Sequence, residues 1–395
     1  MSRWTSYLQR ASGLISRYTG DTPLAPVLKE YFRDNRQMGS TDRRHVSDLV
    51  YGYYRLGHAA PDLPVEERLM LTYFLTRRET SPLLEALKQE WVPLAGLGAL
   101  EKLEALGAYG GITPLRIIDD IFPWRNHLSK GIEPLALATS HLQQPAFFIR
   151  LRPGQEDVVR GALERHGISF ELEDTPGALR VPAGAPLQDI LPADKAYVVQ
   201  DLCSQQVRTL LPVALRGAGG AEPLVWDCCA ASGGKSILIK DVLPGARLTV
   251  SDLRPSILHN LDKRFAVAGI RYERAFAADL TQALPALPEF DLVLADVPCS
   301  GSGTWSRTPE QLYFFQEEKI AGYALLQQAI LRRVAPAVRP GGYLLLVTCS
   351  VFAEENEANV AFLTGEGLVL QTQQVFAGYH RGADTLFGAL LQRPG

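Results

Sequence analysis

Two short apolar runs, residues 292–295 and 343–347, constrain the fold of this chain more than any other feature. Runs of this length and composition are typical of parallel strands that are buried on both faces of a sheet. Cys299 follows the first run and Cys349 follows the second, so each thiol is expected just past the carboxyl end of a strand. Open α/β sheets build their binding sites at that edge. Two thiols together with Asp296 at one sheet edge therefore indicate covalent catalysis.

The rest of the pattern divides the 395 residues into three predicted domains. Residues 1–130 are expected to form an all-helical domain, because apolar side chains recur at helical spacing between Val46 and Gly57. Residues 131–200 combine short alternating runs with one helical segment, which predicts a small α+β module. Residues 201–395 alternate strands and helices, which predicts a doubly wound, mostly parallel sheet of the Rossmann-like α/β class.

The charge of the chain limits how it could bind a nucleic acid. The formal net charge is -3, so RNA contacts must come from local basic patches. Residues 1–57 carry nine lysines and arginines against five acids, a local excess of four positive charges. A phosphate-contacting face and an ordinary solvated helical surface explain this excess equally well.

The sequence also predicts the setting in which the protein works. The first residues lack the apolar core of a signal peptide, and the chain contains no 18-residue apolar run. We therefore expect a soluble, cytoplasmic protein without a membrane partner, acting as a monomer. The five cysteines are an odd number, which favours reduced thiols over a disulfide framework. No zinc-like spacing of cysteine and histidine occurs, so no metal is expected.

A loop of small residues predicts a cofactor site. Residues 224–237 have the form of a strand, a loop and a helix, in which small residues let the backbone approach a ligand and the helix start offers free N–H groups. The P-loop pattern fails because Cys229 occupies the position of its leading glycine, and the dinucleotide glycine pattern fails as well. The loop residues are Cys229, Ala230, Ala231, Ser232, Gly233, Gly234 and Lys235.

Acidic residues follow the strands expected after this loop. Asp252 ends an apolar run 18 residues past Gly234, the distance at which an acid binds a pair of ribose hydroxyls. Asp279 follows a possible short strand at residues 274–276. Acids at successive strand ends together indicate a cofactor that contains adenosine.

These motifs together resemble the Sun/Nop family of RNA (cytosine-5)-methyltransferases. The family shows an Asp-x-Cys-Ala-Ala-Pro-Gly-Gly-Lys loop, an Asp-x-Pro-Cys-Ser-Gly loop and a Thr-Cys-Ser loop followed by acids. The matching segments here are residues 227–235, 296–301 and 348–350. The resemblance is strong over residues 195–395 and implies a Rossmann-like methyltransferase domain with a C-terminal antiparallel hairpin. The N-terminal helices resemble the NusB-like RNA-binding domain of the bacterial branch that methylates small-subunit ribosomal RNA, and the middle module resembles a small RNA-facing domain.

The chain departs from the family pattern at three places. Ser232 stands where the family has proline in the cofactor loop. Ile257 stands where an arginine usually follows the ribose-binding acid. The middle strand ends in residues 150–153 without the usual asparagine, so RNA contacts there are expected to differ.

The resemblance also implies a mechanism and a cofactor. Cys349 would attack C6 of cytosine, Cys299 would assist release of the covalent adduct, and Asp296 would hydrogen-bond the ring at N3 and the exocyclic amine. The methyl donor would be S-adenosyl-L-methionine, bound by residues 229–235, Asp252, Asp279 and Asp296. The opposite order, in which Cys299 attacks, is used by DNA cytosine methyltransferases with a Pro-Cys loop, and the second cysteine motif favours the RNA order.

Three functional hypotheses follow. The first is a cytosine-5 methyltransferase acting on ribosomal RNA of the small subunit. The second changes the substrate to transfer RNA. The third is a non-catalytic RNA-binding ribosome assembly factor on the same fold, although the intact cysteines Cys299 and Cys349 argue against a loss of activity.

Overall fold

The structure is a computed structural model that describes residues 2–216 and 222–395. The chain forms two compact units. The first unit consists of Met1–Leu128, Glu133–Pro145 and Thr304–Glu317, and the second consists of Ser129–Ile132, Ala146–Gly303 and Glu318–Gly395.

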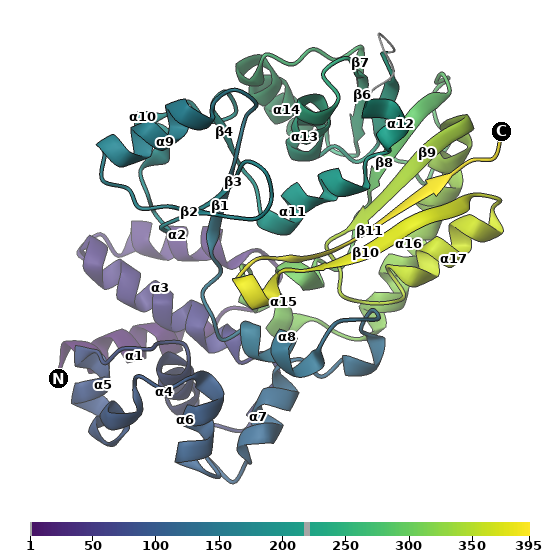
Figure 1. Ribbon diagram of the computed structural model, residues 1–395. Coiled ribbons are helices and arrows are strands. Elements are labelled where there is room, and N and C mark those ends of the chain that lie inside the picture. Colours follow the sequence, from purple (N-terminus) through teal and green to yellow (C-terminus); the bar gives the residue numbers. More distant parts are fainter. Residues whose placement is uncertain (1, 217–221) are drawn as a thin grey trace. The chain divides into compact units, whose positions relative to one another are not determined.

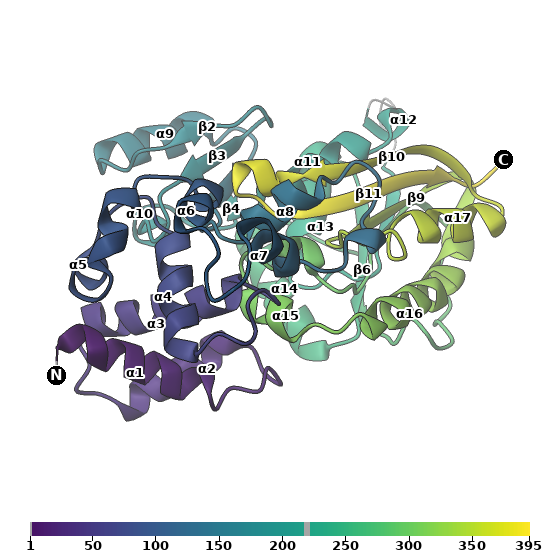
Figure 2. The ribbon, with the colours of Figure 1, turned by 90° about the horizontal axis from the view of Figure 1, so that it is seen from below.

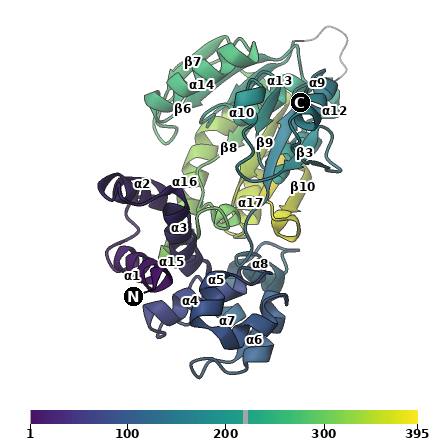
Figure 3. The same ribbon diagram turned by 90° about the vertical axis from the view of Figure 1, so that its left-hand side faces the viewer.

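The first unit is built from helices, of which α1, α4 and α15 pack against α3. Val46, Leu49 and Val50 of α3 are buried, as the helical spacing of these residues predicts. Figure 3 shows α6 and α7 beside α4, at the far end of the unit from α2. The helices are α1 (Arg3–Ile15), α2 (Leu24–Asp34), α3 (Ser40–Arg55), α4 (Val65–Leu75), α5 (Pro82–Leu87), α6 (Ala99–Leu106), α7 (Pro114–Ile121), α8 (Pro134–Ser140) and α15 (Pro309–Phe314).

Helix α15 belongs to the first unit although it lies late in the chain. Leu312 is fully buried, and the ring of Tyr313 lies 5.4 Å from the ring of Tyr54 on α3. The carboxylate of Glu310 accepts a hydrogen bond from the backbone N–H of Leu24, at the start of α2. Residues 304–317, which the sequence pattern groups with residues 201–395, thus help to form the core around α3.

The second unit contains two sheets. The smaller sheet is antiparallel with the order β2-β3-β1-β4, and the larger sheet has the order β10-β11-β9-β8-β5-β6-β7. The strands of the smaller sheet are β1 (Phe147–Leu151), β2 (Glu171–Leu172), β3 (Ala178–Val181) and β4 (Tyr197–Val199). Those of the larger sheet are β5 (Leu224–Asp227), β6 (Arg247–Asp252), β7 (Arg274–Ala277), β8 (Phe290–Asp296), β9 (Val338–Thr348), β10 (Val369–Ala377) and β11 (Thr385–Gln392).

The larger sheet is mostly parallel and closes with an antiparallel hairpin. Strands β7, β6, β5, β8 and β9 run parallel to one another, whereas β11 is antiparallel to both β9 and β10. Figure 1 shows this hairpin in yellow beside β9. The Rossmann-like class and the C-terminal hairpin expected from the sequence are therefore confirmed. The chain order reverses at β5, which lies between β6 and β8, and such a switch point is where open sheets place their ligands.

Helices cover both faces of the larger sheet because its central strands are apolar on both sides. Leu345 of β9 packs in one core and Leu346 in the other. The first core includes α11, α13 and α14, and the second includes α16 and α17, which lie side by side in Figure 2. The helices of this unit are α9 (Glu156–Arg165), α10 (Leu187–Ile190), α11 (Leu202–Gln206), α12 (Val213–Arg216), α13 (Gly234–Val242), α14 (Pro255–Ala268), α16 (Glu318–Val334) and α17 (Glu357–Gly365).

Candidate active site

The loop between β5 and α13 is a tight turn that needs small residues. Gly233 precedes α13 with a φ of 85°, and a Cβ at this position would lie 2.6 Å from the ring of Phe265. Ala231 has a φ of 46°, which is uncommon for a residue with a Cβ and carries backbone strain. The N–H of Ala231 donates a hydrogen bond to the carboxylate of Asp252 at 3.0 Å. This strained loop is therefore held by a partner at the end of the neighbouring strand.

Asp252 joins the cofactor loop to the start of α14. Its Oδ2 accepts the hydrogen bond from Ala231, and its Oδ1 accepts from the backbone N–H of Arg254 at 3.0 Å. Oδ1 also accepts from Nε of Arg254 at 3.3 Å, so Oδ2 is the oxygen that keeps a lone pair for a ligand. Asp252 also lines the cavity, so it is placed both to shape the loop and to contact what the loop binds.

A cavity of about 490 Å³ lies past the carboxyl ends of these strands, within the size range of small-molecule sites. Seven of the residues predicted for the site line it: Cys229, Ala231, Asp252, Asp279, Asp296, Cys299 and Cys349. Five other predicted residues do not line it: Ala230, Ser232, Gly233, Gly234 and Lys235. Ala230, Ser232 and Gly233 belong to the loop before α13, and Gly234 and Lys235 are the first two residues of that helix.

The two thiols meet at one end of the cavity. Sγ of Cys299 lies 3.2 Å from Sγ of Cys349, and both side chains are partly accessible. The hydrogen bond between the thiols and the burial of Cys299 raise the pKa of that thiol well above its ordinary value. The register explains the meeting, because β8 and β9 are adjacent parallel strands that each deliver a cysteine to the same sheet edge.

Asp296, at the end of β8, is paired with the lysine of the cofactor loop. Nζ of Lys235 lies 2.7 Å from Oδ2 of Asp296. Burial lowers the pKa of Lys235, but the attraction of the Asp296 carboxylate and the hydrogen bond to it outweigh burial and leave the pKa raised. The Lys235 ammonium group is thus held by the Asp296 carboxylate, and it also interacts electrostatically with Cys349.

Glu355 connects the two cysteine loops from behind. This carboxylate is fully buried, and its Oε2 accepts from the backbone N–H of Ser300 and from Nε2 of Gln327, both at 2.8 Å. Its Oε1 accepts from the hydroxyl of Ser350 at 2.7 Å. Ser300 and Ser350 each follow a cysteine of the pair. One carboxylate therefore binds the backbone of the residue after Cys299 and the side chain of the residue after Cys349.

Asp279 is exposed, and the hydrogen bonds of its carboxylate are to a residue only two positions away. Its carboxylate accepts hydrogen bonds from the hydroxyl of Thr281 at 2.7 Å and from the backbone N–H of Thr281 at 2.9 Å. These two hydrogen bonds, the side-chain bond first, lower the pKa of Asp279. The residue keeps its charge at the mouth of the cavity.

Some lining residues were not predicted from the sequence. Leu326 and Ile330 of α16 form part of the apolar wall. Their spacing of four residues marks a helix face, but nothing in it distinguishes a cavity wall from an ordinary core contact. Acids follow the second cysteine motif in the family pattern, but no local sequence signal specifies the hydrogen-bond partners of Glu355.

Two negative findings concern the described residues alone. Within residues 2–216 and 222–395, we find no helix with the length and apolar character needed to span a bilayer. Over the same ranges, His, Cys, Asp and Glu side chains form no group of three or more that could hold a metal ion.

Part of the sequence is similar to that of known ribosomal RNA methyltransferases. The sequence profile of the family described as 16S rRNA methyltransferase RsmB/F matches residues 218–377. Ribosomal RNA small subunit methyltransferase B of Pasteurella multocida is 30% identical over 233 residues, which are 56% of this chain and 50% of that protein. The chain thus spans about half the length of the curated relatives it matches.

Solved structures show where the fold recurs. A crystal structure of a protein named PH0851 superposes with a TM-score of 0.66 at 20% identity, covering 92% of this chain and 93% of that one. NSun6 from Pyrococcus horikoshii, crystallised with SFG, gives a TM-score of 0.54 at 18% identity and covers 64% of this chain and 91% of that one. At these identities the likeness concerns the fold.

Proposed function

We propose that this chain is an S-adenosylmethionine-dependent RNA methyltransferase that modifies C5 of cytosine in small-subunit ribosomal RNA. The match of residues 218–377 to the 16S rRNA methyltransferase RsmB/F profile supports this proposal. The observation that carries the proposal is the pair of thiols, 3.2 Å apart, at the edge of a cavity that also holds Asp252 and Asp296. Two thiols in one site fit a reaction in which a covalent bond to the base forms and must then be broken.

The residues around the cavity fit the proposed methyl donor. Cys229 and Ala231 of the small-residue loop line the cavity, and so do Asp252 and Asp279, whose carboxylates suit a ribose and an adenine. S-adenosylmethionine, when bound, supplies an electrophilic methyl group. The relatives named for ribosomal RNA support the choice of substrate.

The chain's own groups divide the covalent work. Cys349 bonds to C6 of cytosine, which turns C5 into a nucleophile, while Asp296 hydrogen-bonds the polar edge of the ring. Once C5 carries the methyl group, loss of the C5 proton sends its electron pair into a restored C5–C6 double bond and expels the thiolate. Cys299 assists this release. The resemblance of the Thr348-Cys349-Ser350 motif to the RNA branch of the family supports this order of roles.

The substrate is tested by mapping the modified base. Bisulfite sequencing of total RNA, with and without the gene, should reveal one cytosine in small-subunit ribosomal RNA that loses its protection when the gene is absent. Loss of protection in a transfer RNA instead would establish the transfer-RNA alternative. Unchanged protection in every RNA, with a defect in ribosome assembly, would favour the non-catalytic factor.

Replacing Asp252 with alanine should weaken cofactor binding by about 2 kcal/mol, because the change removes a charge-assisted contact to the ribose and the partner of the Ala231 N–H. Isothermal titration calorimetry with S-adenosylhomocysteine measures the effect. Asp279→Ala is the matched comparison and should cost less, since this carboxylate is exposed and already engaged with Thr281. Equal affinity in the Asp252 variant and the unmodified chain would contradict the ribose assignment.

Removing positive charge from the N-terminal helices should weaken RNA binding without changing cofactor affinity. Lys29, Arg36 and Arg44 are exposed, and removing a cation that binds a phosphate lowers the salt dependence of binding by about one unit of slope. The triple glutamine variant is compared with the unmodified chain by filter binding of a ribosomal RNA fragment at several salt concentrations. An unchanged slope would assign these residues to the ordinary solvated surface.

A further inference from the structure

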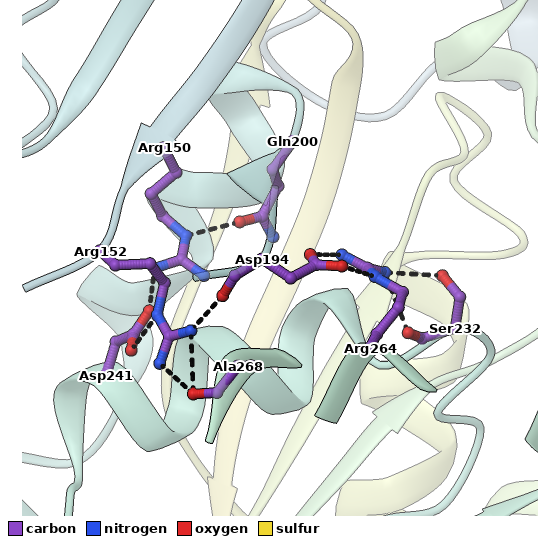
Figure 4. Close-up of polar contacts among 8 residues, drawn as sticks. All are labelled: Arg150, Arg152, Asp194, Gln200, Ser232, Asp241, Arg264 and Ala268. Carbon is purple, nitrogen blue, oxygen red and sulfur yellow. Dashed lines mark hydrogen bonds and ion pairs between the residues drawn. The ribbon is translucent and has the colours of Figure 1, made fainter. Parts of the chain in front are cut away.

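Arg264, on α14, donates hydrogen bonds to Ser232, the residue of the cofactor loop that departs from the family pattern. One guanidinium nitrogen, Nη1, donates to the carbonyl oxygen of Ser232 and to its hydroxyl, both at 2.9 Å (Figure 4). Ser232 stands where the family pattern has proline. Proline fixes its own φ near −65°, whereas serine leaves that angle free, so the loop gains from an external restraint.

The other side of Arg264 is held by the small α+β part of the second unit. The carboxylate of Asp194, which precedes β4, accepts from Nε of Arg264 at 2.9 Å and from Nη2 at 2.6 Å. This bidentate pairing fixes the plane of the guanidinium group. Asp194 itself has a φ of 61°, a strained conformation for a residue with a Cβ. A strained residue persists only where its surroundings hold it in place.

A second ion pair anchors the segment that carries Asp194. Asp241, on α13, pairs with Arg152 at 2.8 Å and with the buried Arg150 of β1. Arg152 also donates to the backbone carbonyl oxygens of Asp194 and Ala268 (Figure 4). The small sheet is thus joined to α13 and α14, the two helices that flank the cofactor loop.

We propose that Arg264 is a positioning residue for the cofactor loop and that Asp194, from the small α+β part, orients it. This inference rests on the proposed binding of S-adenosylmethionine at that loop. The loop already carries strain at Ala231, next to the residue that Arg264 holds. Arg264 therefore supplies from outside the restraint that proline supplies in the family pattern. Cofactor affinity then depends on Asp194, which lies in the module of residues 131–200 that resembles a small RNA-facing domain.

Calorimetry with S-adenosylhomocysteine tests the proposal on the full-length chain. Arg264→Gln should bind about tenfold more weakly, as expected for the loss of charge-assisted hydrogen bonds. Asp194→Asn, which keeps the shape and removes the charge, should weaken binding in the same direction by a smaller factor. The KM for S-adenosylmethionine should rise while the KM for RNA and the kcat at saturating cofactor stay unchanged. Lys263→Gln, an exposed neighbour on the same helix, is the control and should bind normally.

Rescue by proline separates positioning from general stability. Adding Ser232→Pro to the Arg264→Gln chain should restore most of the affinity, because the ring then fixes the backbone that the guanidinium group held. Normal affinity in Arg264→Gln, or parallel losses of cofactor binding, RNA binding and melting temperature without rescue, would overturn the inference. If the unmodified chain does not bind S-adenosylhomocysteine, the proposed function itself fails. Normal binding by the unmodified chain and by both single variants would overturn the positioning role alone.

Discussion

Replacing Cys349 with alanine should abolish both methyl transfer and any covalent link to RNA, whereas Cys299→Ala should accumulate a protein–RNA adduct. The proposed chemistry requires one thiol to bond to the base and the other to help break that bond. The two sulfur atoms are only 3.2 Å apart, so position alone does not separate their roles. Denaturing electrophoresis with radiolabelled RNA and methyl donor measures the adduct and the methylation together.

Cys203→Ala is the control for loss of a thiol as such, because this cysteine is buried outside the cavity and should leave methylation intact. An adduct in Cys349→Ala, and none in Cys299→Ala, would reverse the two roles. Absence of an adduct from both variants, together with methylation at another atom of the base, would remove the cytosine-5 assignment.

Glu355→Ala should lower the free energy of unfolding by about 3 kcal/mol or more. The change leaves three buried donors without their acceptor, on Ser300, Gln327 and Ser350, and each such group costs about 1–3 kcal/mol. Part of that cost is offset by removal of the buried charge. Urea unfolding, followed by tryptophan fluorescence, measures the difference.

Two further variants serve as comparisons for Glu355→Ala. Glu355→Gln keeps an acceptor for the Ser300 N–H and should lose much less stability. Glu366→Ala removes an exposed carboxylate whose ion pair with Arg332 is 3.6 Å long, so its effect should stay below about 1 kcal/mol. If Glu355→Ala unfolds at the same urea concentration as the unmodified chain, the network behind the thiols does not stabilise the fold.

The strands and the cofactor loop could be predicted from the sequence, because both have a local pattern of apolar or small residues. The runs before Cys299 and Cys349 are β8 and β9, and the small-residue loop lies between β5 and α13, as expected. Strand ends follow directly from such patterns, so the edge of the sheet that holds the site could be located before the structure was known.

The partners of the site residues could not be predicted in the same way. Lys235 pairs with Asp296 and Arg264 with Asp194 across 61 and 70 residues of sequence. No local pattern specifies which distant charge a side chain meets, because that depends on how the elements pack. The same holds for α15, because its apolar side chains show that it packs in a core but not which unit provides that core.

The place of α15 in the chain has a consequence for synthesis on the ribosome. Domains generally fold in order as they emerge, the N-terminal one first. Here the core around α3 needs Leu312 and Tyr313, which are made after nearly all of the parallel strands. The N-terminal helices emerge early and must wait for this late segment to complete their packing. The nascent first unit therefore keeps the apolar surface that α15 covers exposed until residues 304–317 have been made.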